Sequence, residues 1–316
     1  MLDPDAKVAA DSLSSILPAP IYTLGVAKAR ELLDTPSGKV PLTAVREVKN
    51  VTIPADSHDI TVRIYRPCDA DKLPALVYIH GGGWTIGGLD GADELCRALA
   101  TKTNCVVVSV EYRLAPEYPF PAGLDDCVTA FNWVAHTTSE LGVDPSRIAI
   151  GGDSAGANLA IAVCQLAMRT DDPLPCFQLL AYPPTNFESQ RPSWTEHANA
   201  PLLTAADARW FMSLYLSDEN DTTNPLVSPE KAPSLAGLPP AHIITADVDV
   251  LRDDSEAFAE QLRNADVNAT ITRYPGVFHG FFTEVGTYAR TAQAIDEAAE
   301  RLVEAWSITI DTESNP

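Results

Sequence analysis

The sequence predicts an α/β fold, with a mostly parallel central sheet of eight strands flanked by helices. Strand-like and helix-like segments alternate from about residue 47 onward. Such alternation is typical of parallel strands joined by right-handed helical crossovers. Several strand candidates are continuously apolar, as expected of strands buried on both faces. The chain has 316 residues, of which 46% are hydrophobic, so it can bury the core of one large domain.

The expected strands differ in pattern along the chain. Residues 60–66 alternate between apolar and polar side chains, which favours a half-exposed antiparallel strand near one edge of the sheet. By contrast, residues 75–79 form an apolar run and 105–110 are apolar except for Ser109, which indicates central parallel strands. The full set of expected strands is 46–54, 60–66, 75–80, 105–110, 147–150, 177–182, 242–246 and 269–274.

Helices are expected between the strands, and one of them should be central. The segment 155–168 is apolar nearly all round, which predicts a buried helix. The other expected helices are 125–137, 205–216, 254–264 and 288–306. Two segments, 1–45 and 183–238, do not fit the alternation. An insertion of this size between two strands is usually functional, so we expect both segments to cover one end of the sheet.

Charge and composition exclude several classes of function. The net charge of −21 would repel nucleic acid and anionic membrane surfaces, so neither is an expected partner. No apolar stretch approaches the roughly 18 residues of a membrane span, and the N-terminus lacks the pattern of a signal peptide. The six cysteines show no metal-ligand spacing, so we expect buried thiols, no metal and a cytoplasmic location.

A Gly-Asp-Ser-Ala-Gly motif at residues 152–156 carries the first chemical signal. It lies between an expected strand and an expected helix, the context in which a G-x-S-x-G turn exposes a nucleophilic serine. Only small residues two positions before and after the serine avoid collision in that strained turn. The start of the helix favours the negative charge that develops during attack. Ser154 is therefore the predicted nucleophile, and a simple glycine-rich turn is the alternative.

A second signal is the run His-Gly-Gly-Gly at residues 80–83, directly after an apolar strand. Successive glycines allow several backbone N–H groups to converge on one point, as an oxyanion hole requires. A phosphate-binding loop is the rival interpretation. No Lys-Ser/Thr pair follows, and Ile86 stands where a dinucleotide fingerprint needs Gly or Ala. No cofactor is therefore expected.

The third signal is His279, just after the last expected strand. Acidic residues follow the preceding strand, and Asp249 and Asp247 are the candidates there. The resulting chain order Ser, Asp, His differs from that of chymotrypsin-type and subtilisin-type enzymes. Its place in that order makes His279 the predicted general base.

Four blocks in this order resemble the hormone-sensitive-lipase family of carboxylesterases, within the α/β-hydrolase superfamily. They are His-Gly-Gly-Gly-Trp at 80–84, Glu-Tyr-Arg-Leu-Ala-Pro-Glu at 111–117, Gly-Asp-Ser-Ala-Gly-Ala-Asn at 152–158 and His-Gly-Phe at 279–281. The resemblance covers about residues 45–306. It implies an α/β-hydrolase fold, with 46–182 and 239–316 as the catalytic domain, 1–45 as the N-terminal part of a helical cap and 183–238 as the cap insertion.

The same resemblance implies roles for individual residues. Asp249 corresponds to the family's acid, although Val250 replaces the proline that follows it in the family, and Asp247 remains the second choice. The implied oxyanion donors are the backbone N–H groups of Gly82, Gly83 and Ala155. The implied reaction is hydrolysis of short- to medium-chain carboxylic esters through an acyl-enzyme.

Two other functions remain open at this stage. An amidase or arylformamidase would use the same triad and glycine loop, and sequence does not distinguish the leaving groups. A non-catalytic small-molecule receptor on this fold is the other alternative, although such receptors typically lose the histidine that is present here as His279.

Apolar residues near the predicted serine should select the substrate. The candidates for the pocket wall are Trp84, Leu203, Phe211 and Phe282. The expected strand 269–274 should lie at the edge of the sheet, where pairing with a second copy is common, so a homodimer through this strand is expected.

Overall fold

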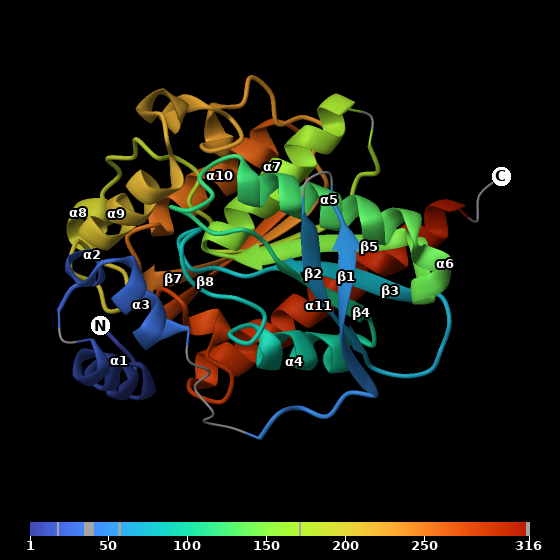
Figure 1. Ribbon diagram of the computed structural model, residues 1–316, viewed down its shortest axis with the longest axis horizontal. Helices are drawn as coiled ribbons and strands as arrows, with labels where there is room; N and C mark the ends of the chain where they lie inside the picture. Colours follow the sequence, from blue (N-terminus) through green and yellow to red (C-terminus); the bar gives the residue numbers. More distant parts are fainter. Residues whose placement is uncertain (18, 35–40, 56–57, 171, 314–316) are drawn as a thin grey trace.

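The central element of the fold is one eight-stranded sheet, with the order β1-β2-β4-β3-β5-β6-β7-β8 (Figure 1). The computed structural model describes residues 1–17, 19–34, 41–55, 58–170 and 172–313. Strand β2 runs antiparallel to both of its neighbours, and the strand pairs from β4 to β8 are parallel. The expected α/β fold is therefore confirmed. The strands are β1 Glu47–Pro54, β2 Asp59–Arg66, β3 Leu73–Ile79, β4 Val106–Glu111, β5 Val143–Asp153, β6 Gln178–Ala181, β7 Ala241–Val248 and β8 Ala269–Phe278.

Helices connect the strands and form both outer layers. Five of them, α5, α7, α9, α10 and α11, correspond to the helices expected from the sequence. The sequence analysis did not predict α4. The helices are α1 Pro4–Ile16, α2 Ile21–Leu24, α3 Val26–Leu33, α4 Asp93–Thr103, α5 Ala122–His136, α6 Thr138–Leu141, α7 Ala155–Thr170, α8 Ser193–Glu196, α9 Ala205–Tyr215, α10 Arg252–Asn264 and α11 Ala289–Glu313, with short 3₁₀ turns at η1 Glu219–Thr223, η2 Pro229–Lys231 and η3 Phe281–Thr283.

The sheet separates two hydrophobic cores. In β4, Val106 and Val108 face the core that α5, α7 and α10 cover, whereas Val107 faces the core beneath α4 and α11. Figure 1 shows these two helical layers on opposite sides of the strands. All three valines are fully buried, and each buried side chain of this size contributes about 1.5–3 kcal/mol to folding. This burial on both faces explains why the central strands are continuously apolar.

The two segments outside the alternation lie together at one end of the sheet. Helices α1, α2, α3, α8 and α9 gather on the same side of the molecule (Figure 1). The backbone N–H of Tyr22 donates to Asp207 Oδ1 of α9 at 2.9 Å, which joins the N-terminal segment to the insertion. Asn158 of α7 donates to the carbonyls of Pro184 and Val227, both at 2.9 Å. The fully buried Asn158 amide therefore anchors the insertion near the start of α7.

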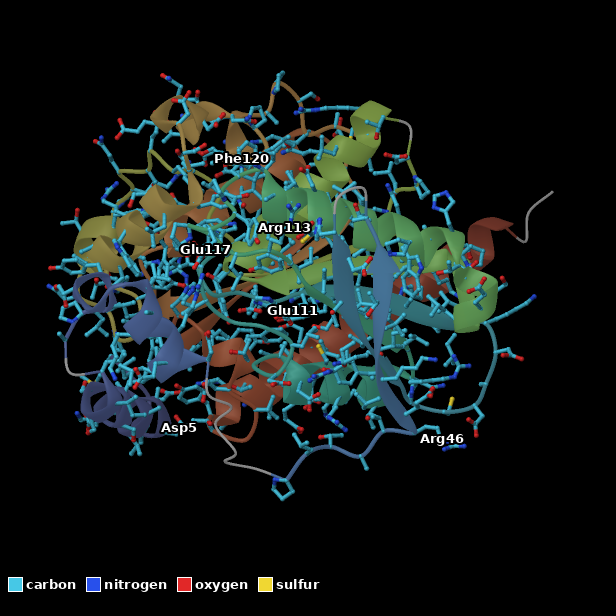
Figure 2. The ribbon with its side chains drawn as sticks, in the orientation of Figure 1. Asp5, Arg46, Glu111, Arg113, Glu117 and Phe120 are labelled. Carbon is cyan, nitrogen blue, oxygen red and sulfur yellow. The ribbon has the colours of Figure 1, made fainter. Side chains whose placement is uncertain are left out.

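The segment after β4 holds neighbouring parts of the chain in place, and Figure 2 labels its charged residues Arg113 and Glu117 together with Glu111, the last residue of β4. Arg113 pairs with Asp126 of α5 at 2.8 Å. Glu117 accepts two hydrogen bonds of 2.8 Å from Arg30 of α3. These hydrogen bonds lower the pKa of Glu117 to about 2. Arg30 also donates to the carbonyls of Thr85 and Ala115, so α3 is tied to the glycine loop.

Candidate active site

Ser154 occupies a sharp turn between β5 and α7. Its φ is +53°, a left-handed conformation that a non-glycine residue adopts only at a cost of about 1–3 kcal/mol. A Cβ atom at Gly152 or Gly156 would lie 2.4 or 2.0 Å from the carbonyl oxygen of Ile79. Only glycine therefore allows the turn to approach β3 this closely, which is the physical reason for the two glycines of the motif.

Three side chains from distant loops form a continuous hydrogen-bonded chain. His279 Nε2 lies 2.9 Å from Ser154 Oγ, and His279 Nδ1 lies 2.8 Å from Asp249 Oδ2. The other carboxylate oxygen of Asp249 accepts the backbone N–H of Leu251 at 2.9 Å, which fixes the carboxylate. Asp249 is fully buried, and Ser154 and His279 are more than 90% buried.

The structure distinguishes between the two candidate acids. The Asp249 carboxylate contacts the imidazole of His279. Asp247 instead accepts a hydrogen bond from Arg252 through its backbone carbonyl, at 3.0 Å. Val250, which stands in place of the family's proline, is fully buried in the core that α10 covers. The loop that carries Asp249 is therefore held by packing on its side chain.

Tyr182 lies against the imidazole and was missed by the sequence analysis. Its ring centroid is 4.5 Å from that of His279, with an angle of 53° between the rings. Tyr182 directly follows β6, is fully buried and has a φ of +38°. Burial raises the pKa of the Tyr182 phenol well above its usual range, so the ring stays neutral. Its position at the carboxyl end of a parallel strand, where α/β folds place functional residues, was the available signal.

The glycine loop brings its backbone close to Ser154. Gly82 and Gly83 have φ values of +109° and +56°. Their N–H groups and that of Ala155, at the start of α7, donate to no protein acceptor within the residues that the structure describes. A Cβ atom at position 83 would lie 2.4 Å from the Phe211 ring, so α9 packs directly on this loop.

Asp153 joins the glycine loop to the serine turn. Its Oδ1 accepts from the Tyr78 hydroxyl at 2.7 Å and from the Gly81 N–H at 3.0 Å. Burial raises the pKa of Asp153, and these two hydrogen bonds act in the opposite direction. The two loops that frame Ser154 are thus held at a fixed separation, a function that the motif alone did not reveal.

A cavity of about 980 Å³ opens onto this arrangement. Ser154, His279 and both loop glycines line it, as do three of the four apolar residues expected in the pocket wall, Trp84, Leu203 and Phe211. Phe282 is the exception and corrects the prediction. It is fully buried in the core beneath α4 and α11, because η3 directs it under the sheet, and it is not part of the wall.

The cavity also contains residues that the sequence analysis did not single out. Leu13 and Ile16 of α1 contribute apolar wall from the N-terminal segment. Charged side chains also line the cavity, with Arg63 bonded to Asp90 at 2.8 Å and Arg97 bonded to Asp93 at 2.7 Å. The cavity wall therefore combines apolar side chains, ion pairs and the proposed nucleophile Ser154.

The described residues show neither a metal-binding cluster nor a membrane-spanning helix. Among the described residues, no group of three or more His, Cys, Asp or Glu side chains is arranged to hold a metal ion. Within the same part of the chain, no helix has the length and apolar character needed to cross a membrane.

Comparisons with known proteins agree with this geometry. A family model described as alpha/beta hydrolase fold matches residues 76–283. Carboxylesterase NlhH of Mycobacterium tuberculosis is 42% identical over 282 residues, covering 87% of this chain and 86% of the relative. The ethyl acetate hydrolase of Pseudomonas putida is 36% identical, covering 78% and 77%.

Solved structures extend the similarity to nearly the whole chain. An alpha/beta hydrolase enzyme from the metagenome of Lake Arreo superposes with a TM-score of 0.92 at 36% identity, covering 97% of this chain and 99% of that one. A hyperthermophilic esterase from Pyrobaculum calidifontis gives 0.90 at 36% identity, covering 96% and 98%. This chain therefore belongs to the hormone-sensitive-lipase family of carboxylesterases in the α/β-hydrolase superfamily.

Proposed function

We propose that the protein hydrolyses short- to medium-chain carboxylic esters, with Ser154 as nucleophile, His279 as general base and Asp249 as the orienting acid. The observation that carries this proposal is the hydrogen-bonded chain from Asp249 through His279 to Ser154, which opens into an apolar cavity. The carboxylesterase and ethyl acetate hydrolase names of the relatives support ester hydrolysis.

In the first half of the reaction, Ser154 Oγ attacks the ester carbonyl and its proton passes to His279 Nε2. The Oγ–C bond forms as the carbonyl π electrons move to oxygen. The C–O bond to the alcohol then breaks, and His279 returns the proton to the leaving alkoxide. Asp249 keeps the Nδ1 proton directed at itself and stabilises the imidazolium that forms between these two transfers.

The oxyanion of the tetrahedral intermediate would be bound by the N–H groups of Gly82, Gly83 and Ala155. Because these amides lack protein acceptors in the described chain, they are available to a ligand. The loss of one such donor costs other serine hydrolases about 3 kcal/mol of transition-state stabilisation. In the second half, His279 deprotonates a water that attacks the acyl carbonyl, and the acid leaves as Ser154 regains its proton.

We further propose that residues 1–45 and 183–238 act as a cap over the catalytic domain, 46–182 and 239–316. Leu13, Leu203 and Phe211 from these two segments line the cavity, which supports this division. The apolar wall suits the hydrocarbon part of an ester. The size of the cavity, about 980 Å³, suits short and medium chains.

A homodimer and a cytoplasmic location belong to the same proposal. Strand β8 ends the sheet, and the edge of such a strand can pair with a second copy. A molar mass near twice 33.9 kDa in light scattering, with slowed hydrogen exchange in β8, is the result expected of a homodimer, and a monomer would overturn this proposal.

All six cysteines are free, which fits the proposed location in a reducing compartment such as the cytoplasm.

Replacement of the proposed nucleophile tests the function. Ser154→Ala should lower the kcat for p-nitrophenyl butyrate by about 10⁴-fold or more, because the variant lacks the attacking oxygen. Ser307→Ala, at an exposed position on α11, is the matched control and should retain wild-type turnover. Equal turnover by the two variants would overturn the proposal.

A further inference from the structure

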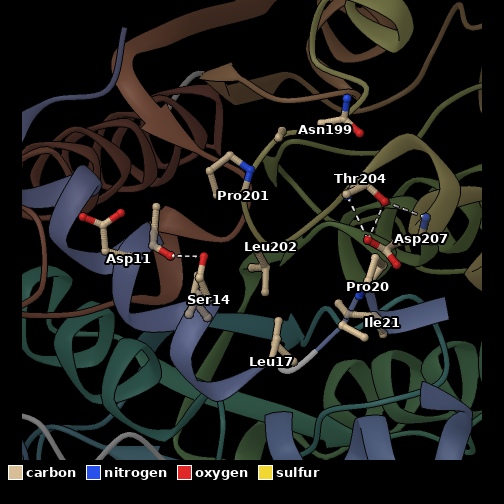
Figure 3. Close-up of a pocket in the computed structure, with 14 residues that line it drawn as sticks. Asp11, Ser14, Leu17, Pro20, Ile21, Asn199, Pro201, Leu202, Thr204 and Asp207 are labelled. Carbon is tan, nitrogen blue, oxygen red and sulfur yellow. Dashed lines mark hydrogen bonds between the residues drawn. The ribbon is translucent and has the colours of Figure 1, made fainter. Parts of the chain in front are cut away.

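A second pocket lies beside the catalytic cavity, between α1 and the loop that precedes α9 (Figure 3). Its volume of about 380 Å³ falls within the range of small-ligand sites, roughly 300–1,000 Å³. Leu17 from the end of α1 and Pro201 from the loop are part of its wall. We call this space the outer pocket.

The outer pocket and the catalytic cavity share part of one wall. Leu13, Ile21 and Leu202 line both spaces. Because the same three side chains border both spaces, they form part of the boundary between them. Figure 3 labels Leu202 and Ile21 among the residues that line the outer pocket.

Leu202 is the unusual member of this wall. Its φ is +64°, a left-handed conformation that is rare for leucine and characteristic of ligand-binding and switch positions. Its Cδ2 atom packs on Gly280, where an added Cβ would lie only 2.8 Å away. Gly280 directly follows His279, so the leucine side chain stands between the outer pocket and the backbone beside the imidazole.

Four of the five polar side chains around the outer pocket, including Asp11, have protein partners, and the fifth, Asn199, is exposed to solvent. The Ser14 hydroxyl donates to the Ala10 carbonyl at 3.0 Å. Thr204 and Asp207 bond to each other at the start of α9, and Asp207 also accepts the Tyr22 N–H. The remaining wall is largely alanine, leucine, isoleucine and proline. The part of the outer pocket that Leu202 and Ile21 line therefore suits an apolar occupant, because a polar one would find few groups free to bond with it there.

We propose that the outer pocket is a second apolar subsite that Leu202 separates from the catalytic cavity, and that it takes the hydrocarbon tail of a long ester once the Leu202 side chain moves aside or is shortened. This inference rests on the proposed esterase function. The tail belongs to either the acyl or the alcohol part of the ester. Both parts share the same chemistry, and the test distinguishes them.

The test opens the boundary between the two spaces and measures chain-length preference in two substrate series. Leu202→Ala is assayed with p-nitrophenyl esters of C4 to C12 acids and with acetates of C2 to C10 alcohols. Each methylene that enters a dry subsite is worth about fourfold in kcat/KM, or ~0.8 kcal/mol. With two or three methylenes entering, the ratio of long-chain to short-chain kcat/KM should rise about 15- to 60-fold over wild type, in the series whose tail enters.

A second substitution fills the outer pocket from its far side. Ser14→Phe, added to Leu202→Ala, should remove the gain for long chains, because Ser14 lines the outer pocket and not the catalytic cavity. Ser15→Phe, also at an exposed position of α1 but outside both linings, is the matched control and should leave the gain intact.

Each outcome separates this inference from the function on which it rests. If Leu202→Ala hydrolyses p-nitrophenyl acetate but both chain-length profiles match wild type, the subsite is wrong and the esterase stands. If Ser154→Ala hydrolyses the esters as well as wild type, the proposed function itself fails. Leu202→Gly, which adopts a φ of +64° without strain, repeats the test should Leu202→Ala not fold. Unchanged profiles in that variant overturn the subsite equally.

Discussion

Backbone strain in this protein gathers around the candidate site. Seven non-glycine residues of the described chain have positive φ, and four of them border the catalytic cavity or its imidazole: Trp84, Ser154, Tyr182 and Leu202. Such conformations cost about 1–3 kcal/mol each and persist where the surrounding structure enforces them. The sequence predicted that Ser154, Asp249 and His279 would meet. The strain at Tyr182 and Leu202 depends on tertiary packing, so no local pattern indicated it.

Tyr182 offers a test at the scale of one residue. Its ring faces the imidazole, and a neutral aromatic ring within about 6 Å of a cation stabilises that cation. Tyr182→Leu should therefore lower kcat about tenfold while KM changes less than twofold, because the imidazolium forms only as the reaction proceeds. Tyr182→Phe keeps the ring and should restore most of the kcat. Equal losses in both variants, or a loss confined to KM, would contradict this account.

At the scale of elements, strands were predicted better than helices. The central strands have apolar runs that only burial on both faces explains, and β3, β4 and β7 were placed within two residues at each end. Helix α4 was missed, although Asp93 begins it and Asn104, in a left-handed conformation, ends it. Its short apolar face packs against α11, and that partner lies about 190 residues away in the chain.

His242 links three elements and predicts how stability depends on pH. It lies on β7, bonds to Thr270 of β8 at 2.9 Å and lies 3.9 Å from Glu297 of α11. Burial lowers the pKa of His242 from 6.5 to about 4. Between these values the unfolded chain binds a proton that the folded protein does not. The free energy of unfolding is therefore highest, as far as this group is concerned, above pH 6.5. It falls by roughly 3 kcal/mol as the pH drops from 6.5 toward 4.

Chemical denaturation at pH 7, 5.5 and 4 checks this dependence. His242→Gln should flatten the fall in the free energy of unfolding, because it removes the group that titrates differently in the two states. His136→Gln, at an exposed position on α5, removes one histidine elsewhere and should leave the fall unchanged. Parallel curves for the two variants would show that His242 does not carry the effect.

At the scale of the whole molecule, the cavity is assembled from parts that are far apart in the chain. The N-terminal helices, the glycine loop and the insertion meet only in the folded structure, and contacts such as Arg30 with Glu117 and Asn158 with Val227 hold them together. The sequence predicted that the two additional segments would cover the sheet. It could not predict that α1 would supply cavity wall, because α1 carries no motif and its role depends on where the chain packs.

Covalent trapping of the nucleophile tests the central claim most directly. Diethyl p-nitrophenyl phosphate phosphorylates an activated serine as p-nitrophenolate leaves, and the adduct is stable enough for peptide mass spectrometry. We expect one diethylphosphoryl group per chain, located on Ser154, formed far more slowly in His279→Asn and absent in Ser154→Ala. Inactivation with the adduct on another residue, or an unmodified Ser154 in a fully inactivated protein, would contradict the account.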